Sequence, residues 1–216
     1  MPRRMGYDAR PQAVDRLAAS VTLRGETIHQ DLATAGATFC SGATYLVFLR
    51  VVDQLQKTGP LRLPSPALAR LAKLDVKDGE EVFGRWNANG PGAARLFHEL
   101  KCGVNFTSWE SARPGDFLKM WWTDAIGGQE SGHLVVYLGH DQEQVRFWSA
   151  NQPDGYGNKS VPRSQIKRHL FSRLTHPSRL ARATRLSPCD SFLARMLHHD
   201  FTWGQVVAAC GVVDTP

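Results

Sequence analysis

The pattern of apolar residues changes after Gly103, and this change constrains the fold more than any other feature of the sequence. Before it, apolar side chains recur at helical spacing, for example Tyr45, Phe48, Leu49 and Val52, as in a helix with one buried face. After it, short apolar runs alternate with turn residues, which is typical of strands. Helices followed by consecutive strands predict an α+β fold, with a helix of the first half packed on an antiparallel sheet.

The spacing assigns the elements as follows. Helices are predicted over residues 11–19, 41–56, 65–74, 79–88 and 91–100. Strands are predicted over residues 117–122, 133–139, 145–150 and 170–174, with a loop at 151–159, which is rich in Gly, Pro and Asn. A short helix is expected at 163–169, and the remaining residues predict helices around 188–197 and 203–210.

Composition excludes several classes of protein. The chain has 216 residues and four widely spaced cysteines with no CxxC pair, which argues against a zinc ribbon and against a disulfide framework. It has no Gly-rich phosphate loop and no HExxH motif, and we expect no cofactor. No stretch approaches the ~20 apolar residues that a membrane span needs. The first 24 residues lack the apolar core of a signal peptide. The sequence is therefore compatible with a cytoplasmic protein, with non-classical export, or with a leader already removed.

Basic residues gather in one segment. Seven of them, with no acidic residue, lie between Ser160 and Ser187, while the whole chain carries a net charge of +6. Such a segment is able to bind an anionic polymer such as nucleic acid, a cell-wall polymer or a membrane surface. The alternative is a solvated face. Phe171 is its one aromatic residue, which argues against binding of single-stranded nucleic acid.

Cys40 is the strongest candidate for a catalytic residue. It directly precedes the predicted helix of residues 41–56, where backbone N–H groups and the helix dipole stabilise a thiolate. Ser41 and Gly42 are small enough to let a substrate approach, and the N–H of Cys40 or Ser41 is a candidate oxyanion-hole donor. The alternative is an inert buried thiol.

His133 is the best candidate base for such a thiol. It follows Ser131-Gly132 and opens an apolar strand, so a rigid element would hold it. If Gly139 opposes Val145 in the next hairpin, then His133 lies opposite Asn151, and Ser149 shares its face. Asn151 would then orient the imidazole. Ser149 is an alternative on the same face, and a register slip of one residue would present Gln152 instead.

Three further residues are candidates for substrate binding. They are Ser41 beside the thiol, Ser149 on the histidine face, and Trp148 as an aromatic wall of a groove. Aromatic residues on strands are, however, more often part of a core. Asp116, in Pro114-Gly115-Asp116, is predicted to serve a turn rather than catalysis.

The order of these motifs resembles that of a known superfamily. Cys40 at a helix start, Pro114-Gly115-Asp116 before a strand, Gly132-His133 at a strand start and a polar residue at or near Asn151 resemble the NlpC/P60 and CHAP superfamily of papain-like cysteine hydrolases. The resemblance covers about residues 35–174. It implies a papain-like core, a Cys/His/polar triad without a metal, and amide cleavage, most often in the stem peptides of peptidoglycan.

These observations predict three segments and one leading function. We expect an N-terminal extension at 1–34, a hydrolase domain at 35–174 with a helical insertion at about 60–105, and a helical tail at 175–216. The leading function is a cysteine amidase or endopeptidase with peptidoglycan or another peptide as substrate, and the basic 160–187 segment as a site for the anionic wall polymer. The alternatives are a thiol-dependent acyltransferase or thioesterase, and a non-catalytic module that binds an anionic polymer.

Overall fold

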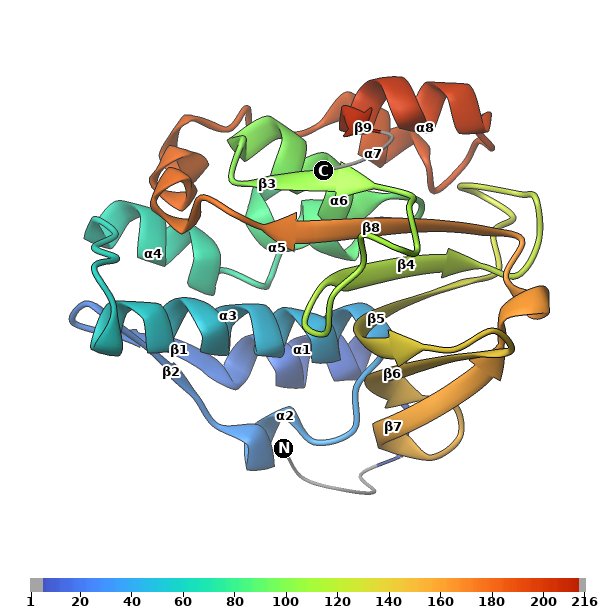
Figure 1. The fold of residues 1–216 in the computed structure, drawn as a ribbon. Coiled ribbons are helices and arrows are strands. Elements are labelled where there is room, and N and C mark those ends of the chain that lie inside the picture. Colours follow the sequence, from blue (N-terminus) through green and yellow to red (C-terminus); the bar gives the residue numbers. More distant parts are fainter. Residues whose placement is uncertain (1–5, 214–216) are drawn as a thin grey trace.

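Helices dominate the first half of the chain and strands the second, as the sequence predicts (Figure 1). The computed structural model describes residues 6–213, so the ends of the predicted extension (1–5) and tail (214–216) lie outside the described residues. The helices are α1 (Pro11–Ala19), α2 (Leu32–Ala35), α3 (Cys40–Thr58), α4 (Ser65–Ala72), α5 (Glu81–Asn87), α6 (Gly92–Leu100), the 3-10 helices η1 (Arg163–Gln165) and η2 (Pro177–Arg185), α7 (Ser191–Arg195) and α8 (Trp203–Cys210).

The strands form two sheets and confirm an α+β fold. They are β1 (Val21–Arg24), β2 (Thr27–Gln30), β3 (Gly103–Phe106), β4 (Phe117–Trp121), β5 (Gly132–His140), β6 (Gln144–Asn151), β7 (Gly155–Pro162), β8 (Arg168–Leu174) and β9 (Val212–Val213). β1 and β2 form a hairpin, and the other seven form one sheet in the order β7-β6-β5-β4-β8-β3-β9. The expectation of a purely antiparallel sheet is wrong, because β9 pairs parallel to β3.

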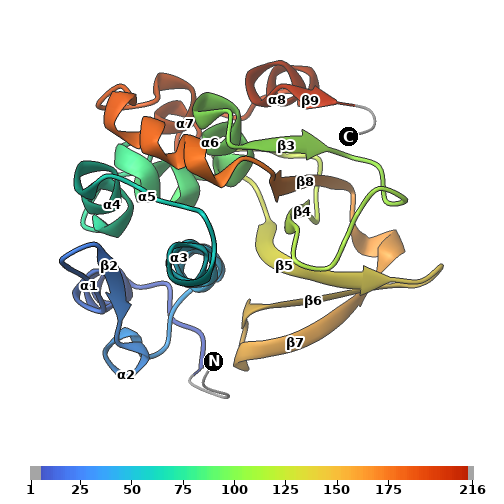
Figure 2. The same cartoon turned by 60° about the vertical axis from the view of Figure 1, so that its left-hand side comes forward.

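α3 is the central helix of the molecule. Figure 2, which looks almost along its axis, shows it between the sheet on one side and α1, α4 and α5 on the other. Tyr45, Phe48, Leu49 and Val52 are fully buried, which accounts for the apolar positions at helical spacing. Gly59 ends the helix, with its N–H donating to Leu55 O at 2.9 Å.

An aromatic cluster fixes α3 against the sheet. Phe48 stacks on Trp86 of α5, and Trp86 meets Phe117 of β4 edge-to-face, with ring centroids 4.7 Å apart. Phe97 of α6 packs against all three of these rings. Such pairs contribute about 0.5–1.5 kcal/mol each beyond the area that they bury. The cluster therefore fixes the position of α3, and with it Cys40, relative to the sheet.

The β5–β6 hairpin keeps the predicted register next to the site but departs from it at the hairpin tip. Val136 pairs with Trp148 and Tyr137 with Phe147, the register in which the sequence predicts His133 opposite Asn151. At the tip, however, Gly139 pairs with Arg146 rather than with Val145, because a bulge adds Leu138 to β5. A bulge absorbs one extra residue without disturbing the ladder on either side of it.

Several regions differ from their predictions, among them the hairpin β1–β2 and the helix α2, which stand where a loop to Cys40 was expected. Residues 155–162 form β7, the edge strand, where the sequence analysis expected a loop to 159. Its exposed middle, Asn158-Lys159-Ser160, carries no apolar pattern, and an edge strand needs none on its outer side. The predicted helix at 163–169 is only a 3-10 turn, because β8 begins at Arg168.

The three predicted segments share apolar cores. Leu17 and Ile28 of the N-terminal segment, and Leu68 and Leu96 of the inserted helices, lie in one cluster with α3. In the tail, Val206 and Cys210 pack against Trp121 of β4 and Leu170 of β8. Within the described residues, no helix has both the length and the apolarity to cross a bilayer.

Candidate active site

Cys40 is the first residue of the central helix, as the sequence predicts. Phe39 is the N-cap with an extended backbone, and no side chain caps this end of the helix. The N–H groups of the first turn therefore remain available to an anion at the thiol, where the helix dipole also favours a negative charge. The side chain of Cys40 is partly buried, whereas Cys102 and Cys210 are buried and Cys189 is exposed.

The thiol of Cys40 has a lowered pKa. Burial raises it, but the hydrogen bond and charge of His133, the N–H of Leu134 and the charge of Lys119 outweigh burial and bring the pKa to about 7. In contrast, burial raises the pKa of Cys102 and of Cys210 to about 12. Since the thiolate is the nucleophile, Cys40 is the activated thiol of the three.

His133 interacts with the Cys40 thiol and with the side chain of Asn151. His133 Nε2 lies 3.1 Å from Asn151 Oδ1. The Asn151 amide nitrogen donates to the carbonyl oxygens of Ser149 and Gly157, so the amide oxygen must face the ring, and Nε2–H is the donor. His133 Nδ1 is then the nitrogen left for the thiol. Of Asn151, Ser149 and Gln152, Asn151 is the one whose side chain is hydrogen-bonded to the His133 ring in the described structure.

The other two candidates lie elsewhere. Ser149 is fully buried and its hydroxyl donates to Leu134 O at 2.9 Å, so it ties β6 to the strand of His133 and does not reach a substrate. Gln152 lines a pocket beside Asn151 rather than binding the ring. The register slip that would have exchanged Asn151 and Gln152 does not occur.

Ser41 and Trp148 have different surroundings. Ser41 lines a pocket next to the thiol, and its hydroxyl donates to Asn87 Oδ1 at 2.7 Å. Trp148 points to the opposite face of β6 from Asn151 and stacks on Tyr156, in a cluster with Ala43 of α3. Trp148 therefore packs the helix onto the sheet, and it is not placed as the wall of a groove.

Gly42 is also explained by packing rather than by substrate access. A Cβ atom at this position would lie 2.7 Å from Thr38 Oγ1 and 2.9 Å from Leu17 Cδ2. The glycine lets the segment before Cys40 cross closely over the first turn of α3. It therefore fixes the approach of the chain to the thiol.

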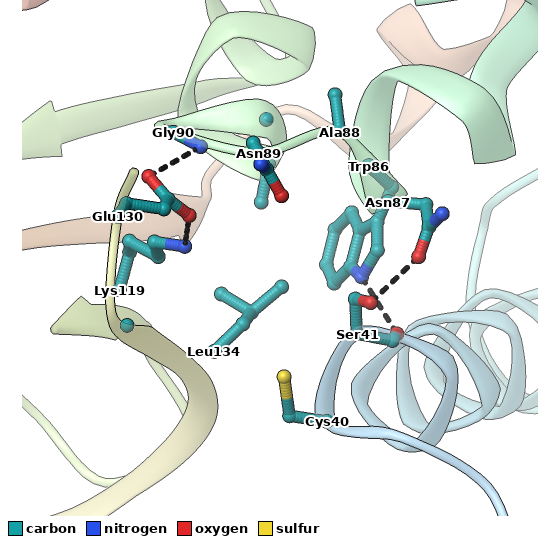
Figure 3. Close-up of a pocket in the computed structure, with 13 residues that line it drawn as sticks. Cys40, Ser41, Trp86, Asn87, Ala88, Asn89, Gly90, Lys119, Glu130 and Leu134 are labelled. Carbon is teal, nitrogen blue, oxygen red and sulfur yellow. Dashed lines mark hydrogen bonds and ion pairs between the residues drawn. The ribbon is translucent and has the colours of Figure 1, made fainter. Parts of the chain in front are cut away.

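Two pockets meet at the start of β5. The thiol-side pocket, about 170 Å³, lies between Cys40 and Ser41, the loop around Gly90, and Lys119, Gly132 and Leu134 (Figure 3). The histidine-side pocket, about 260 Å³, is lined by Tyr7, Trp122, His133, Asn151 and their neighbours. Gly132 lines both. A substrate bound across Gly132 would place groups on both sides of the thiol and the imidazole.

Tyr7 is a site residue that the sequence analysis missed. Its backbone bridges to Thr38, and the buried carboxylate of Asp8 binds Arg16, whose guanidinium also donates to Ala37 O. Burial, and then the negative charge of the nearby Cys40 thiolate, raise the pKa of Tyr7 to about 12. The hydroxyl therefore keeps its proton and can donate a hydrogen bond in the histidine-side pocket. Nothing in the sequence signals this, because the pairing joins residues 31 positions apart.

Lys119 and Glu130 form an ion pair in the thiol-side pocket. Lys119 Nζ lies 2.6 Å from Glu130 Oε1, and the two side chains are 14% and 6% exposed. Burial raises the pKa of Glu130, but Lys119, the Gly90 N–H and Trp121 more than offset this and lower it. The signal in the sequence is a lysine inside the apolar run Phe117-Leu118-Lys119-Met120-Trp121, which we read only as a strand.

The basic segment does not form one free cationic face. Arg173 pairs with buried Asp116 and Arg168 with Asp124. Arg179 and Arg182 donate to the carbonyl oxygens of Lys101 and Leu100, and Arg163 lies over the Trp109 ring. Internal contacts of this kind weaken the case for a polymer-binding site. Among residues 6–213, no group of three or more His, Cys, Asp or Glu side chains is arranged to hold a metal ion.

Comparison of the chain with protein-family models, with curated proteins and with solved structures finds no match.

The lowered pKa of Cys40 leads to a measurable pH dependence. We expect the alkylation rate of Cys40 to reach half its maximum near pH 7, because its pKa is about 7. In His133→Ala, burial still raises the pKa of the thiol, while the hydrogen bond and the charge of His133 that lower it are lost. The pKa should therefore exceed the ~8.5 of a free cysteine, and the alkylation rate at pH 6 should fall more than about tenfold. Iodoacetamide kinetics in a Cys189→Ala background would measure this. Identical pH profiles with and without His133 would contradict the pairing.

Proposed function

We propose that this protein is a cysteine hydrolase that cleaves an amide bond through an acyl-enzyme. The observation that carries the proposal is that His133 interacts both with the Cys40 thiol, whose pKa it lowers, and with Asn151. A nucleophile, a base and a group that orients the base are the three parts that such chemistry needs. We further propose that the core is papain-like and related to the NlpC/P60 and CHAP superfamily, on the strength of the motif order described above.

The first half-reaction would form the acyl-enzyme. The Cys40 thiolate attacks the carbonyl carbon of the substrate, and the carbon–sulfur bond forms as the carbonyl oxygen becomes an oxyanion. The N–H groups at the start of α3 and the Tyr7 hydroxyl are the candidate donors to that oxygen. The His133 imidazolium then protonates the leaving nitrogen, the carbon–nitrogen bond breaks, and a thioester remains on Cys40.

The second half-reaction would release the acid. Neutral His133 takes a proton from water, the resulting hydroxide attacks the thioester carbonyl, and the carbon–sulfur bond breaks. The thiolate and the imidazolium are thereby restored. Asn151 would hold the ring orientation throughout, since its amide oxygen binds Nε2 while its nitrogen is fixed by two backbone carbonyls.

The substrate class that we propose is a peptide, with peptidoglycan stem peptides first among them. The support for the stem peptides is the motif resemblance, and the support for a peptide is the presence of a pocket on each side of the reacting groups. Such pockets would accept the groups that flank a scissile amide.

Digestion of purified peptidoglycan tests this proposal. We expect wild-type protein to release fragments with one new amine and one new carboxylate per cut, and intact-protein mass spectrometry to detect an acyl group on Cys40 when the reaction is quenched with acid. An acyl group that passes to an added amine and not to water would instead indicate an acyltransferase. Absence of cleavage and of an acyl adduct, with peptidoglycan and with a panel of peptides, would contradict the hydrolase proposal.

A further inference from the structure

The thiol-side pocket contains one cationic and one anionic side chain, Lys119 and Glu130. In Figure 3 both reach in from the side opposite Ser41 and Trp86, with Cys40 and Leu134 between the two walls. The charge of Lys119 is close enough to Cys40 to lower the pKa of the thiol. A group held by Lys119 would therefore lie in the same pocket as the reacting sulfur.

Glu130 already accepts four hydrogen bonds from the protein, which leaves little capacity for a substrate. Its Oε1 accepts from Lys119, and its Oε2 accepts from the N–H groups of Gly90 and Gly127 and from Trp121 Nε1. Three neutral donors thus share in stabilising the carboxylate, in addition to Lys119. The remaining lone pair on Oε1 lies beside the ammonium of Lys119, so a substrate cation bound there would be repelled by a like charge, and the pocket disfavours a cation.

Lys119 has donors to spare. An ammonium group has three N–H bonds, and within the described part of the chain one is used, on Glu130. The ammonium also depends on Gly132, because a Cβ atom there would lie 3.1 Å from Lys119 Nζ. Gly132 thus leaves room for a cation beside the start of β5, where both pockets meet.

We propose that Lys119 binds a carboxylate of the substrate in the thiol-side pocket, so that the enzyme prefers acyl compounds with an acidic side chain or a terminal carboxylate beside the scissile bond. This inference rests on the proposed function. Glu130 would act as a positioning residue that holds the ammonium in place. A carboxylate would form a charge-assisted hydrogen bond with the free donors of Lys119, which a neutral amide would form only weakly.

Two alkylating reagents of nearly equal size test this directly. Iodoacetate carries a carboxylate where iodoacetamide carries a carboxamide, and with both the Cys40 thiolate forms a bond to the methylene carbon as iodide leaves. The ratio of their second-order rate constants cancels the fraction of thiolate. We expect Lys119→Met to lower the iodoacetate to iodoacetamide ratio about tenfold and Glu130→Gln to raise it, because the ammonium then loses its competing anion.

The background and the controls separate this effect from others. All variants would carry Cys189→Ala, since Cys189 is exposed, while Cys102 and Cys210 are buried. Lys167→Met, at an exposed position outside both pockets, removes the same charge and should leave the ratio unchanged. If Lys119→Met folds poorly with Glu130 unpaired, the double variant Lys119→Met/Glu130→Gln keeps the pocket neutral and should also lower the ratio.

The outcomes distinguish a failure of the carboxylate site from a failure of the hydrolase proposal on which it rests. Fast alkylation of Cys40 by both reagents, with a ratio indifferent to Lys119, would overturn the carboxylate site and leave the hydrolase proposal standing. Slow alkylation by both reagents in every variant would overturn the hydrolase proposal and the inference with it.

Discussion

Replacing Cys40 by alanine is expected to abolish hydrolysis, with a loss of kcat/KM of about 10⁴-fold or more, as is found when a covalent nucleophile is removed. The loss should be purely chemical. Cys40 is partly buried at the first position of α3, and alanine is well tolerated there, so the free energy of unfolding should change by less than about 1 kcal/mol. Cleavage of the wild-type substrate, followed by mass spectrometry and combined with urea denaturation, measures both quantities.

Two variants sharpen this experiment. Cys40→Ser retains the shape but replaces the thiol by a hydroxyl that His133 cannot ionise to the same degree, so it should be nearly as inactive as Cys40→Ala. Cys189→Ala removes the exposed cysteine and should retain full activity. Wild-type turnover by Cys40→Ala would disprove the assignment of the nucleophile.

Replacing Asp116 by alanine is expected to lower the free energy of unfolding by about 3–5 kcal/mol, more than any of the other substitutions. The change breaks a buried ion pair and leaves Arg173 without its counter-charge. Both carboxylate oxygens bind Arg173, at 2.7 Å each, and Oδ2 also accepts from the Arg113 N–H. The Asp116 side chain is 4% exposed. Chemical denaturation of the variant measures the loss.

The same experiment has a matched control in the chain. Asp124 pairs with Arg168, but its side chain is 77% exposed, so Asp124→Ala should lower stability by no more than about 1 kcal/mol. Asp116 lies at the end of β4 and β5 away from Gly132, so the folded Asp116→Ala protein should alkylate at Cys40 as the wild type does. A small stability change, or a lost thiol reactivity in the folded state, would show that Asp116 acts otherwise than as a structural anchor.

Much of the fold is predictable from the sequence because its elements have strong local patterns. The helical apolar spacing from Tyr45 to Val52 marks α3, and the strands at 117–121 and 132–140 are dense apolar runs between turn residues. The predicted helix at 203–210 matches α8, which has a capping box formed by Thr202 and Gln205. In each of these cases local preference and burial agree.

The errors occur where pairing across the sheet overrides local preference. β7 is rich in Gly and polar residues, and it is a strand because every residue from Gly155 to Pro162 pairs with β6. β9 has only two residues, Val212 and Val213, and depends on β3 for its conformation. No pattern within a single segment reports such a partner.

The residues of the candidate site likewise fall into those that local sequence pattern predicts and those that it does not. Cys40, His133 and Asn151 could be proposed because two of them stand at the starts of strongly patterned elements and the third follows from hairpin register. Lys119 and Tyr7 could not be assigned, because tertiary packing brings them into the two pockets. Lys119 comes from β4, across the space left by Gly132, and Tyr7 comes from the segment paired with Thr38.

The bulge at Leu138 divides the β5–β6 hairpin into two parts with different registers. Between the bulge and the site the strands keep one register, and beyond it, from Gly139 to the turn, they keep another. Changes of length in the turn at residues 141–143 can therefore be absorbed before they reach His133 and Asn151. This turn is a suitable place to graft an epitope or a fluorophore without moving His133 and Asn151.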